Sequence, residues 1–128
     1  MLNDNEAIAT IGVKRIDKAK KFYEGVLGFK SVGGDEHEGV AAYDSGGSKL
    51  FVYESEYAGT NKATAATWVV DDIESTVKTL KGRGVHFEHY NFPDSKLEGD
   101  VHVSGKMRSA WFKDPDGNIL AIVNNSEH

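Results

Sequence analysis

The sequence predicts an α+β fold made of two βαβββ units, and three observations support this prediction. The chain has 128 residues, which is the usual length of a single domain. Its two halves repeat each other, since residues 8–13 match residues 65–70 and residues 44–52 match residues 114–122. Within each half the hydrophobic periodicity changes from that of a strand to that of a helix and back to strands. Such a repeat indicates a duplicated structural unit.

Each half opens with a short strand and continues with a helix. The strands are predicted over residues 7–13 and 64–70. Apolar side chains then recur with the 3.6-residue period of a helix that is buried on one face. They are Ile16, Ala19, Tyr23, Val26 and Leu27 in the first half and Ile73, Thr76, Val77 and Leu80 in the second. Asp71 and Glu74 have the spacing of a capping box, and Gly28 and Gly84 supply the left-handed residue that commonly ends a helix.

Three further strands complete each half. They are predicted near residues 29–33, 39–44 and 48–54 and near residues 85–90, 106–113 and 118–124. The second half is longer, and its extra residues fall near 91–105, where turn-forming and polar residues predict an inserted loop. We therefore predict one domain over residues 1–128, with modules at about 5–56 and 62–125.

The last hairpin determines which side chains share a face of the second sheet. In residues 114–118 (Asp-Pro-Asp-Gly-Asn) the proline favours a type I turn and the glycine a left-handed position, which predicts a three-residue loop. Phe112 then pairs with Leu120 and faces the helices, while Trp111 and Ser109 lie on the opposite, concave face.

The same loop length at residues 44–48 predicts the faces of the first sheet. Ala42, Leu50 and Val52 would face a helix, whereas Ala41, Tyr43, Lys49, Phe51 and Tyr53 would lie on the concave face. Trp68 is out of phase with Thr67 in the strand at 64–70, so we predict it in the core beneath the second helix.

Composition and charge limit the partners of the chain. Fifteen Lys+Arg against 20 Asp+Glu give a formal charge of −5, and without a basic cluster nucleic acid is not an expected partner. Apolar runs are far shorter than a membrane span, so neither a membrane nor a secretory signal is expected. The sequence has no cysteine, which excludes disulfides, thiolate metal sites and a cysteine nucleophile. A cytoplasmic protein is the expectation.

Four features in this order over residues 7–124 resemble the glyoxalase/bleomycin resistance/extradiol dioxygenase superfamily, also called vicinal oxygen chelate (VOC) proteins. They are the paired βαβββ units, Phe22-Tyr23 before Leu27-Gly28-Phe29, Val70-Asp71-Asp72-Ile73 at the second helix, and Trp111-Phe112-Lys113-Asp114-Pro115-Asp116-Gly117-Asn118 near the C-terminus. The resemblance implies an incompletely closed eight-stranded barrel around a pocket, with the helices outside and usually as a homodimer. It specifies the fold and leaves the function open.

Enzymes of this superfamily hold a metal ion with His, Gln or Glu from the first and last strands of the two units. The resemblance places these ligand positions at Ile8, Phe51, Ala65 and Ala121. Hydrocarbon side chains offer no ligand atom to a divalent metal. We therefore expect no metal and no other cofactor. The metal-dependent isomerase, dioxygenase and transferase activities are not expected either, because the metal ligands that they need are missing.

Two other kinds of site stay open. A site with two histidines and one carboxylate is conceivable in the second half, although solvated side chains on a half-exposed strand are the simpler interpretation. Its donors would be His86, Glu88, Tyr90 and His102. A metal-independent enzyme would need acid–base groups near the concave face, and those available are Tyr53, Ser109, Arg108 and His86.

The concave face is predicted to carry aromatic and small polar side chains. The predicted ligand-binding residues are Tyr43, Phe51, Tyr53, Thr67, Ser109 and Trp111. Aromatic walls of this kind suit a flat or apolar organic ligand, although the same rings could instead fill a small barrel.

We therefore interpret the chain as a small-molecule-binding protein of the glyoxalase/bleomycin resistance type. It would lack the usual metal site and hold an apolar or aromatic ligand in the barrel pocket. The alternative is a lyase or dioxygenase-like enzyme of the same superfamily that acts without metal or at a non-standard metal site.

Overall fold

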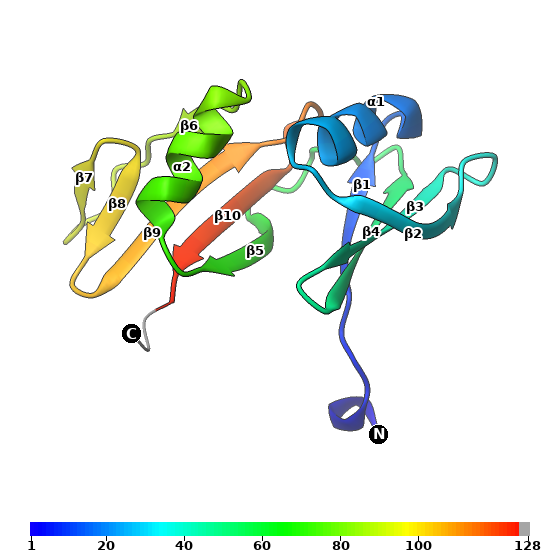
Figure 1. Ribbon diagram of the computed structural model, residues 1–128, viewed down its shortest axis with the longest axis horizontal. Helices are drawn as coiled ribbons and strands as arrows, with labels where there is room; N and C mark the ends of the chain where they lie inside the picture. The colour runs from blue at the N-terminus through cyan, green and yellow to red at the C-terminus, as the bar shows by residue number, and fades with distance from the viewer. Residues whose placement is uncertain (126–128) are drawn as a thin grey trace.

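The computed structural model describes residues 1–125 and contains two units, of which the first is the predicted βαβββ unit and the second has five strands after its helix instead of three (Figure 1). The first unit comprises β1 (Ala9–Val13), α1 (Ile16–Lys20), which continues as a π-helical segment (Lys21–Val26), β2 (Lys30–Asp35), β3 (Val40–Ser45) and β4 (Ser48–Glu54). The second comprises β5 (Thr64–Val70), α2 (Ile73–Gly82), β6 (Phe87–Glu88), β7 (Lys96–Glu98), β8 (Val101–Ser104), β9 (Met107–Lys113) and β10 (Ile119–Asn124). A short 3-10 helix (Leu2–Asp4) precedes the first unit.

The strands form two sheets that lie side by side. The first has the order β1-β4-β3-β2, and the second has the order β5-β10-β9-β8-β7, with β6 paired to β9. In each sheet the first strand of the unit pairs in parallel with the last. α1 contacts the first sheet and α2 the second, and both helices lie on the same side (Figure 1). The two sheets therefore make an incompletely closed barrel with the helices outside.

Both helix ends predicted from glycine are present. Gly28 and Gly84 have φ angles of +81° and +93°, a conformation that costs glycine little. The cap at the start of α2 lies one residue later than predicted, because the side chain of Asp72, rather than that of Asp71, accepts the Ser75 N–H at 3.1 Å.

The inserted segment at residues 91–105 forms a hairpin rather than the predicted loop. β7 pairs with β8, and β8 pairs with β9, so the insertion extends the second sheet. Gly99 and Gly105 have φ angles of +63° and +60° and lie in the turns at the two ends of β8. The turn-forming residues that predicted a loop thus separate short strands.

Asp100, in the β7–β8 turn, ties the hairpin to the rest of the second unit. Its carboxylate lies 2.7 Å from Lys81 Nζ of α2 and 2.7 Å from His89 Nε2. Hydrogen bonds from Lys81 and His89 hold the pKa of Asp100 below its ordinary value.

The register predicted for the last hairpin is confirmed. Phe112 pairs with Leu120, Trp111 with Ala121 and Ser109 with Val123. Phe112 and Leu120 are both buried in the core.

The register predicted for the first hairpin is wrong by one residue. Ser45 pairs directly with Ser48, so the loop has two residues rather than three. Those residues, Gly46 and Gly47, have φ angles of +56° and +89°, which are typical of the type I′ turn of a tight hairpin. Tyr43 consequently pairs with Leu50 on the helix side of the sheet.

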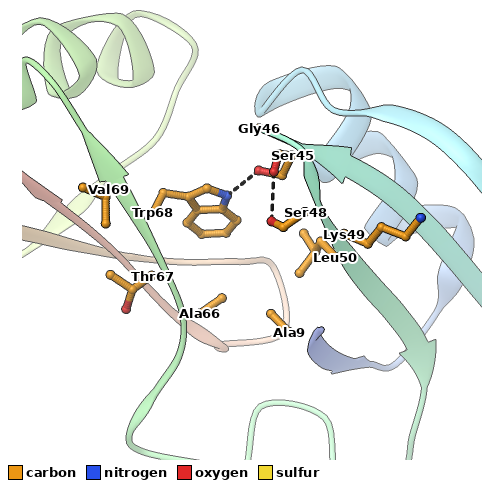
Figure 2. Close-up of a pocket in the computed structure, with 10 residues that line it drawn as sticks. All are labelled: Ala9, Ser45, Gly46, Ser48, Lys49, Leu50, Ala66, Thr67, Trp68 and Val69. Carbon is orange, nitrogen blue, oxygen red and sulfur yellow. Dashed lines mark hydrogen bonds between the residues drawn. The ribbon is translucent and has the colours of Figure 1, made fainter. Parts of the chain in front are cut away.

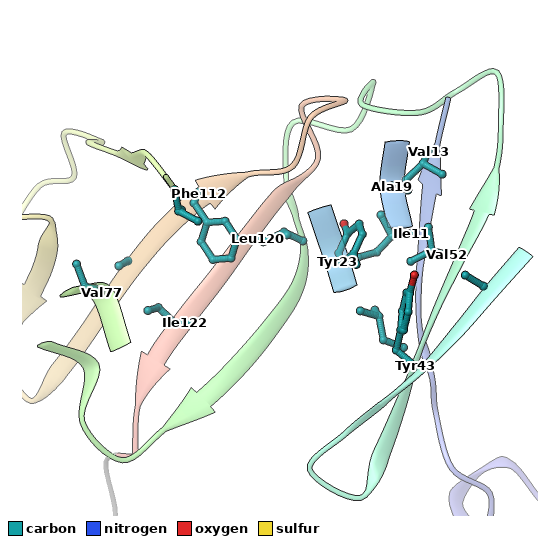
Figure 3. Close-up of a cluster of buried hydrophobic side chains, with 14 of the residues drawn as sticks. Ile11, Val13, Ala19, Tyr23, Tyr43, Val52, Val77, Phe112, Leu120 and Ile122 are labelled. Carbon is teal, nitrogen blue, oxygen red and sulfur yellow. The ribbon is translucent and has the colours of Figure 1, made fainter. Parts of the chain in front are cut away.

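The core is one continuous cluster between the helices and the two sheets, with a group of side chains against each sheet (Figure 3). Tyr23 and Tyr43 are its largest fully buried side chains. Their rings stack with centroids 6.2 Å apart.

A buried polar network joins the last hairpin to the first unit. Tyr23 Oη donates to Asp114 Oδ2 at 2.9 Å, and Asn118 Nδ2 donates to Asp114 Oδ2 at 2.8 Å and to the Gly12 carbonyl at 2.7 Å. The backbone N–H groups of Asp116 and Asn118 donate to Asp114 Oδ1 at 3.0 and 2.8 Å. The Asp114 carboxylate and the Asn118 amide therefore link the last hairpin of the second sheet to the first unit.

Candidate functional site

Three of the predicted ligand-binding residues lie on the open face of the second sheet. Thr67, Ala121 and Trp111 form a row across β5, β10 and β9. Ser109 is opposite Val123 on β10 and His102 on β8 and is buried. The structure thus places Thr67, Ser109 and Trp111 on one surface.

The other three predicted residues lie in the first unit, and one of them is misplaced by the sequence-based register. Phe51 forms a row with Thr10 and Ala42 on the open face of the first sheet. Tyr53 lines a separate cavity of about 150 Å³ near the junction of the two sheets. Tyr43 lies in the core instead of the concave face, because the Gly46-Gly47 loop is one residue shorter than predicted. The six residues therefore do not line one cavity within a chain.

The cavity that Trp111 lines has a volume of about 390 Å³, which falls in the range of small-molecule sites. Its lining residues are Lys62, Ala63, Thr64, Tyr90, Phe92, Trp111 and Ile119. Trp111 Nε1 donates to Thr64 Oγ1 at 3.2 Å, which ties the indole to the start of β5. Three of the seven lining residues are aromatic, so the cavity offers a ligand aromatic walls.

Four rings pack together at this cavity. Trp111 lies 5.6 Å from Tyr90, 5.4 Å from Phe92 and 5.0 Å from His102, measured between ring centroids. The His102 ring meets the indole edge to face, with an interplanar angle of 82°. The side chains come from the segment after β6, from β8 and from β9, so the inserted hairpin helps to build the site.

His102 is buried in this cluster, with 3% of its surface exposed. Its Nε2 atom accepts the Tyr90 backbone N–H at 2.9 Å. Burial raises the pKa of the Tyr90 hydroxyl, and the nearby Glu88 carboxylate raises it further. The tyrosine is therefore a neutral hydrogen-bond donor at pH 7.

The four positions at which the resemblance implies metal ligands carry residues that do not fit a metal ion. Phe51, Ala65 and Ala121 lie on strands β4, β5 and β10, and Ile8 directly precedes β1. All four present hydrocarbon, which offers a metal ion no ligand atom. Across residues 1–125, no three His, Asp or Glu side chains gather closely enough to hold a metal ion.

The alternative metal ligands predicted from the sequence are exposed or have other partners. His86 is exposed, Glu88 pairs with Lys113 at 3.5 Å, and His102 Nε2 is occupied by the Tyr90 amide. Among the possible acid–base groups, Arg108 pairs with Glu74 of α2.

A further cavity of about 260 Å³ lies between the two sheets, and the predicted ligand-binding residue Thr67 lines this cavity rather than that of Trp111 (Figure 2). Trp68 reaches across it, and its Nε1 donates to Ser45 Oγ of the first hairpin at 3.0 Å. The indole also stacks on Phe29 with centroids 5.7 Å apart and borders a small apolar cavity against Leu80 of α2. Trp68 therefore packs against the core as predicted, but it is partly exposed and bridges the two units.

Among the residues that line the Trp111 cavity, the sequence identified only Trp111 as ligand-binding. It missed the aromatic residues Tyr90 and Phe92, the other lining residues Lys62, Ala63, Thr64 and Ile119, and His102 beside the cavity. The available signal was two aromatic residues at alternate positions, with Tyr90 at the end of the strand predicted near residues 85–90 and Phe92 in the segment predicted as a loop. His102 could be placed opposite Ser109 only once β8 was recognised as a strand.

Comparison with known proteins identifies the family to which this fold belongs. The model of the Glyoxalase/Bleomycin resistance protein/Dioxygenase superfamily matches residues 7–122, whereas no curated protein matches the chain. Within residues 1–125, no helix has the length and apolar character needed to span a membrane.

Several solved structures share the fold at low sequence identity. An integron cassette protein from the mobile metagenome of a Halifax Harbour sewage outfall is 21% identical, with a TM-score of 0.71 over 94% of this chain and 98% of that one. The fosfomycin resistance protein FosX from Listeria monocytogenes is 14% identical, with a TM-score of 0.69 over 94% and 93%. The antibiotic-binding protein TnmS3 from a Streptomyces species is 20% identical, with a TM-score of 0.63 over 94% and 96%.

The matched family model covers nearly all of both βαβββ units, and the open barrel agrees with it. The chain therefore belongs to the glyoxalase/bleomycin resistance protein/dioxygenase superfamily.

Proposed function

We propose that this protein binds a small apolar or aromatic organic compound on the open face of its second sheet, without the metal ion of the superfamily's enzymes. The observation that carries the proposal is the cavity of about 390 Å³ with Tyr90, Phe92 and Trp111 as its aromatic walls. Aromatic side chains bind flat ligands by stacking and by burying apolar surface. The hydrocarbon side chains at the four metal-ligand positions support the metal-free part of the proposal.

The comparisons support binding as a function that this fold can perform. TnmS3, which shares the fold, is an antibiotic-binding protein. FosX is a fosfomycin resistance protein, so the same architecture serves different tasks.

We also propose that the chain forms a homodimer through its open faces. These faces expose large apolar side chains, including Tyr53 (42% exposed), Val69 (67%) and Met107 (55%). A second copy of the chain would cover these exposed side chains, and exposed apolar surface is typical of interaction sites in soluble proteins when it forms one patch. Sedimentation at micromolar concentration is expected to give a dimer of about 28 kDa, twice the 14.0 kDa of the chain, because interfaces of ordinary size hold at this concentration. A compact monomer would contradict the proposal.

The two tryptophans are expected to respond differently to an aromatic ligand. Trp111 lines the proposed site, whereas Trp68 stacks on Phe29 in another part of the molecule. The Trp68→Phe protein is therefore expected to keep the quenching of tryptophan fluorescence by bound aromatic compounds, and Trp111→Phe to lose it. Fluorescence titration of both variants with a series of naphthalene derivatives measures this.

The control for the metal-free proposal is the same titration after dialysis against EDTA, which is expected to leave the quenching unchanged. Loss of binding on chelation, with recovery on adding a divalent metal, would contradict the proposal. So would a protein in which no aromatic compound quenches Trp111.

A further inference from the structure

The ring cluster at the Trp111 cavity contains two buried polar atoms that have no hydrogen-bond partner among residues 1–125. They are the hydroxyl of Tyr90 and Nδ1 of His102. Buried polar atoms in native proteins are nearly always paired. Tyr90 lines the cavity, and His102 packs against its three aromatic rings without lining it. The two unpaired atoms therefore point to a group that enters the ring cluster from the cavity.

The hydrogen bond at His102 Nε2 determines whether the unpaired Nδ1 atom is a donor or an acceptor. The Tyr90 backbone N–H can only donate, so His102 Nε2 must accept and carries no proton. A neutral imidazole then carries its single proton on Nδ1. His102 Nδ1–H is consequently a hydrogen-bond donor, and it lacks an acceptor in the described part of the chain.

The Tyr90 hydroxyl is also a donor. Its phenol is desolvated and lies near the Glu88 carboxylate, both of which favour the protonated form. Tyr90 lines the cavity directly, and its ring lies 6.1 Å from that of His102. The cluster therefore combines aromatic walls with two donors and offers no matching acceptor of its own.

We propose that the ligand of this site is a planar aromatic compound that carries a hydrogen-bond acceptor oxygen, such as that of a ketone or a carboxylate. The Tyr90 hydroxyl donates to this oxygen, and His102 Nδ1–H is the second donor. The inference rests on the proposed function, because it names the ligand class of the same site. Phe92, 43% exposed and in contact with both Trp111 and His102, is the ring that the ligand would displace to reach His102.

The experiment compares two uncharged compounds of similar shape, 2-acetonaphthone and 2-ethylnaphthalene, which differ in the acceptor oxygen. Binding is followed by quenching of Trp111 fluorescence in the Trp68→Phe protein. The ketone is expected to bind about five- to tenfold more tightly than the hydrocarbon, as one neutral hydrogen bond contributes. A second substitution, Tyr90→Phe, is expected to reduce this difference, because only His102 then donates to the oxygen, and to leave the affinity for 2-ethylnaphthalene unchanged. The matched control Tyr57→Phe deletes the hydroxyl of an exposed tyrosine outside the cavity and is expected to change neither affinity.

The affinities of the two compounds distinguish the hydrogen bond to an acceptor oxygen from the binding of aromatic compounds in general. If both compounds bind equally well and Tyr90→Phe changes neither affinity, the donors are paired with water, and the inference is overturned while the binding function stands. If neither compound quenches Trp111, the proposed function fails and the inference fails with it.

An independent measurement addresses His102 without any ligand. A long-range ¹H–¹⁵N spectrum of the histidine rings at pH 7 is expected to show His102 protonated at Nδ1 and not at Nε2, and the Nδ1–H signal is expected to shift when 2-acetonaphthone is added. Protonation at Nε2 would overturn the role of His102 as a donor.

Discussion

Replacing Asp114 with alanine is expected to lower the free energy of unfolding by about 4 kcal/mol, which is near the upper end for single substitutions. The carboxylate is buried and accepts four hydrogen bonds, from Tyr23, from the Asn118 side chain and from two backbone N–H groups. Removing it leaves these donors without an acceptor in a desolvated site, and each such donor costs about 1–3 kcal/mol unless water enters. The midpoint of urea unfolding measures the loss, provided that the slope of the transition is unchanged.

The duplicated sequence supplies a matched control for this substitution. Asp44 occupies the equivalent place in the first half, but its side chain is exposed, so Asp44→Ala is expected to change stability by no more than about 0.5 kcal/mol. Tyr23→Phe removes a single bond to the carboxylate and is expected to cost about 2 kcal/mol. Equal effects of the two aspartate substitutions would show that the network around Asp114 does not stabilise the fold.

Replacing Tyr43 with alanine is expected to cost about 3–5 kcal/mol of stability, the range for deleting a large aromatic side chain from a core. Tyr43 is fully buried, stacks on Tyr23 and donates from its hydroxyl to Glu24 Oε2 at 3.0 Å. Burial and this hydrogen bond raise the pKa of Tyr43 above its ordinary value. Phe51→Ala is the comparison, because Phe51 is on the opposite face of the same sheet and partly exposed. It is expected to cost about 1 kcal/mol.

These two variants test the register of the first hairpin. With the three-residue loop that the sequence suggested, Tyr43 would belong to the concave face, and its removal would weaken ligand binding with a small loss of stability. The structure leads to the opposite expectation: the conservative variant Tyr43→Phe should stay folded and keep the quenching of Trp111 by aromatic compounds. Weakened quenching in a stable Tyr43→Phe protein would contradict the core position.

The contrast between the two hairpins shows what could be predicted from the sequence. Residues 114–118 contain proline and glycine at positions that favour one loop length, and the predicted pairing of Trp111 with Ala121 is confirmed. Residues 44–48 contain adjacent glycines, which permit both a two- and a three-residue loop. Since side chains alternate between faces, an error of one residue in loop length moved Tyr43 from the core to the predicted pocket.

The site was less accessible to prediction than the fold. Trp111 could be placed on the open face because it lies beside a well-defined turn. The Tyr90 ring meets it because β6, which precedes Tyr90, pairs with β9, and the His102 ring meets it because the inserted hairpin pairs with β9. Both pairings bring together segments whose hydrophobic pattern is weak. Contacts of this kind depend on tertiary structure and leave little trace in local periodicity.

The contacts between the two units are reciprocal, because each unit contributes a hairpin that hydrogen-bonds to the other. The last hairpin reaches the first unit through Asn118 and Gly12, and the first hairpin reaches the second unit through Ser45 and Trp68. The Trp111 cavity itself is lined by residues of the second unit alone. The pairing of β10 with β5 and β9 and the hydrogen bond from Trp111 to Thr64 position its walls before anything occupies it. A ligand would then have to order little beyond the Phe92 side chain, and the loss of conformational entropy that usually opposes binding would be small. The cavity can therefore bind a small ligand with little rearrangement of its walls.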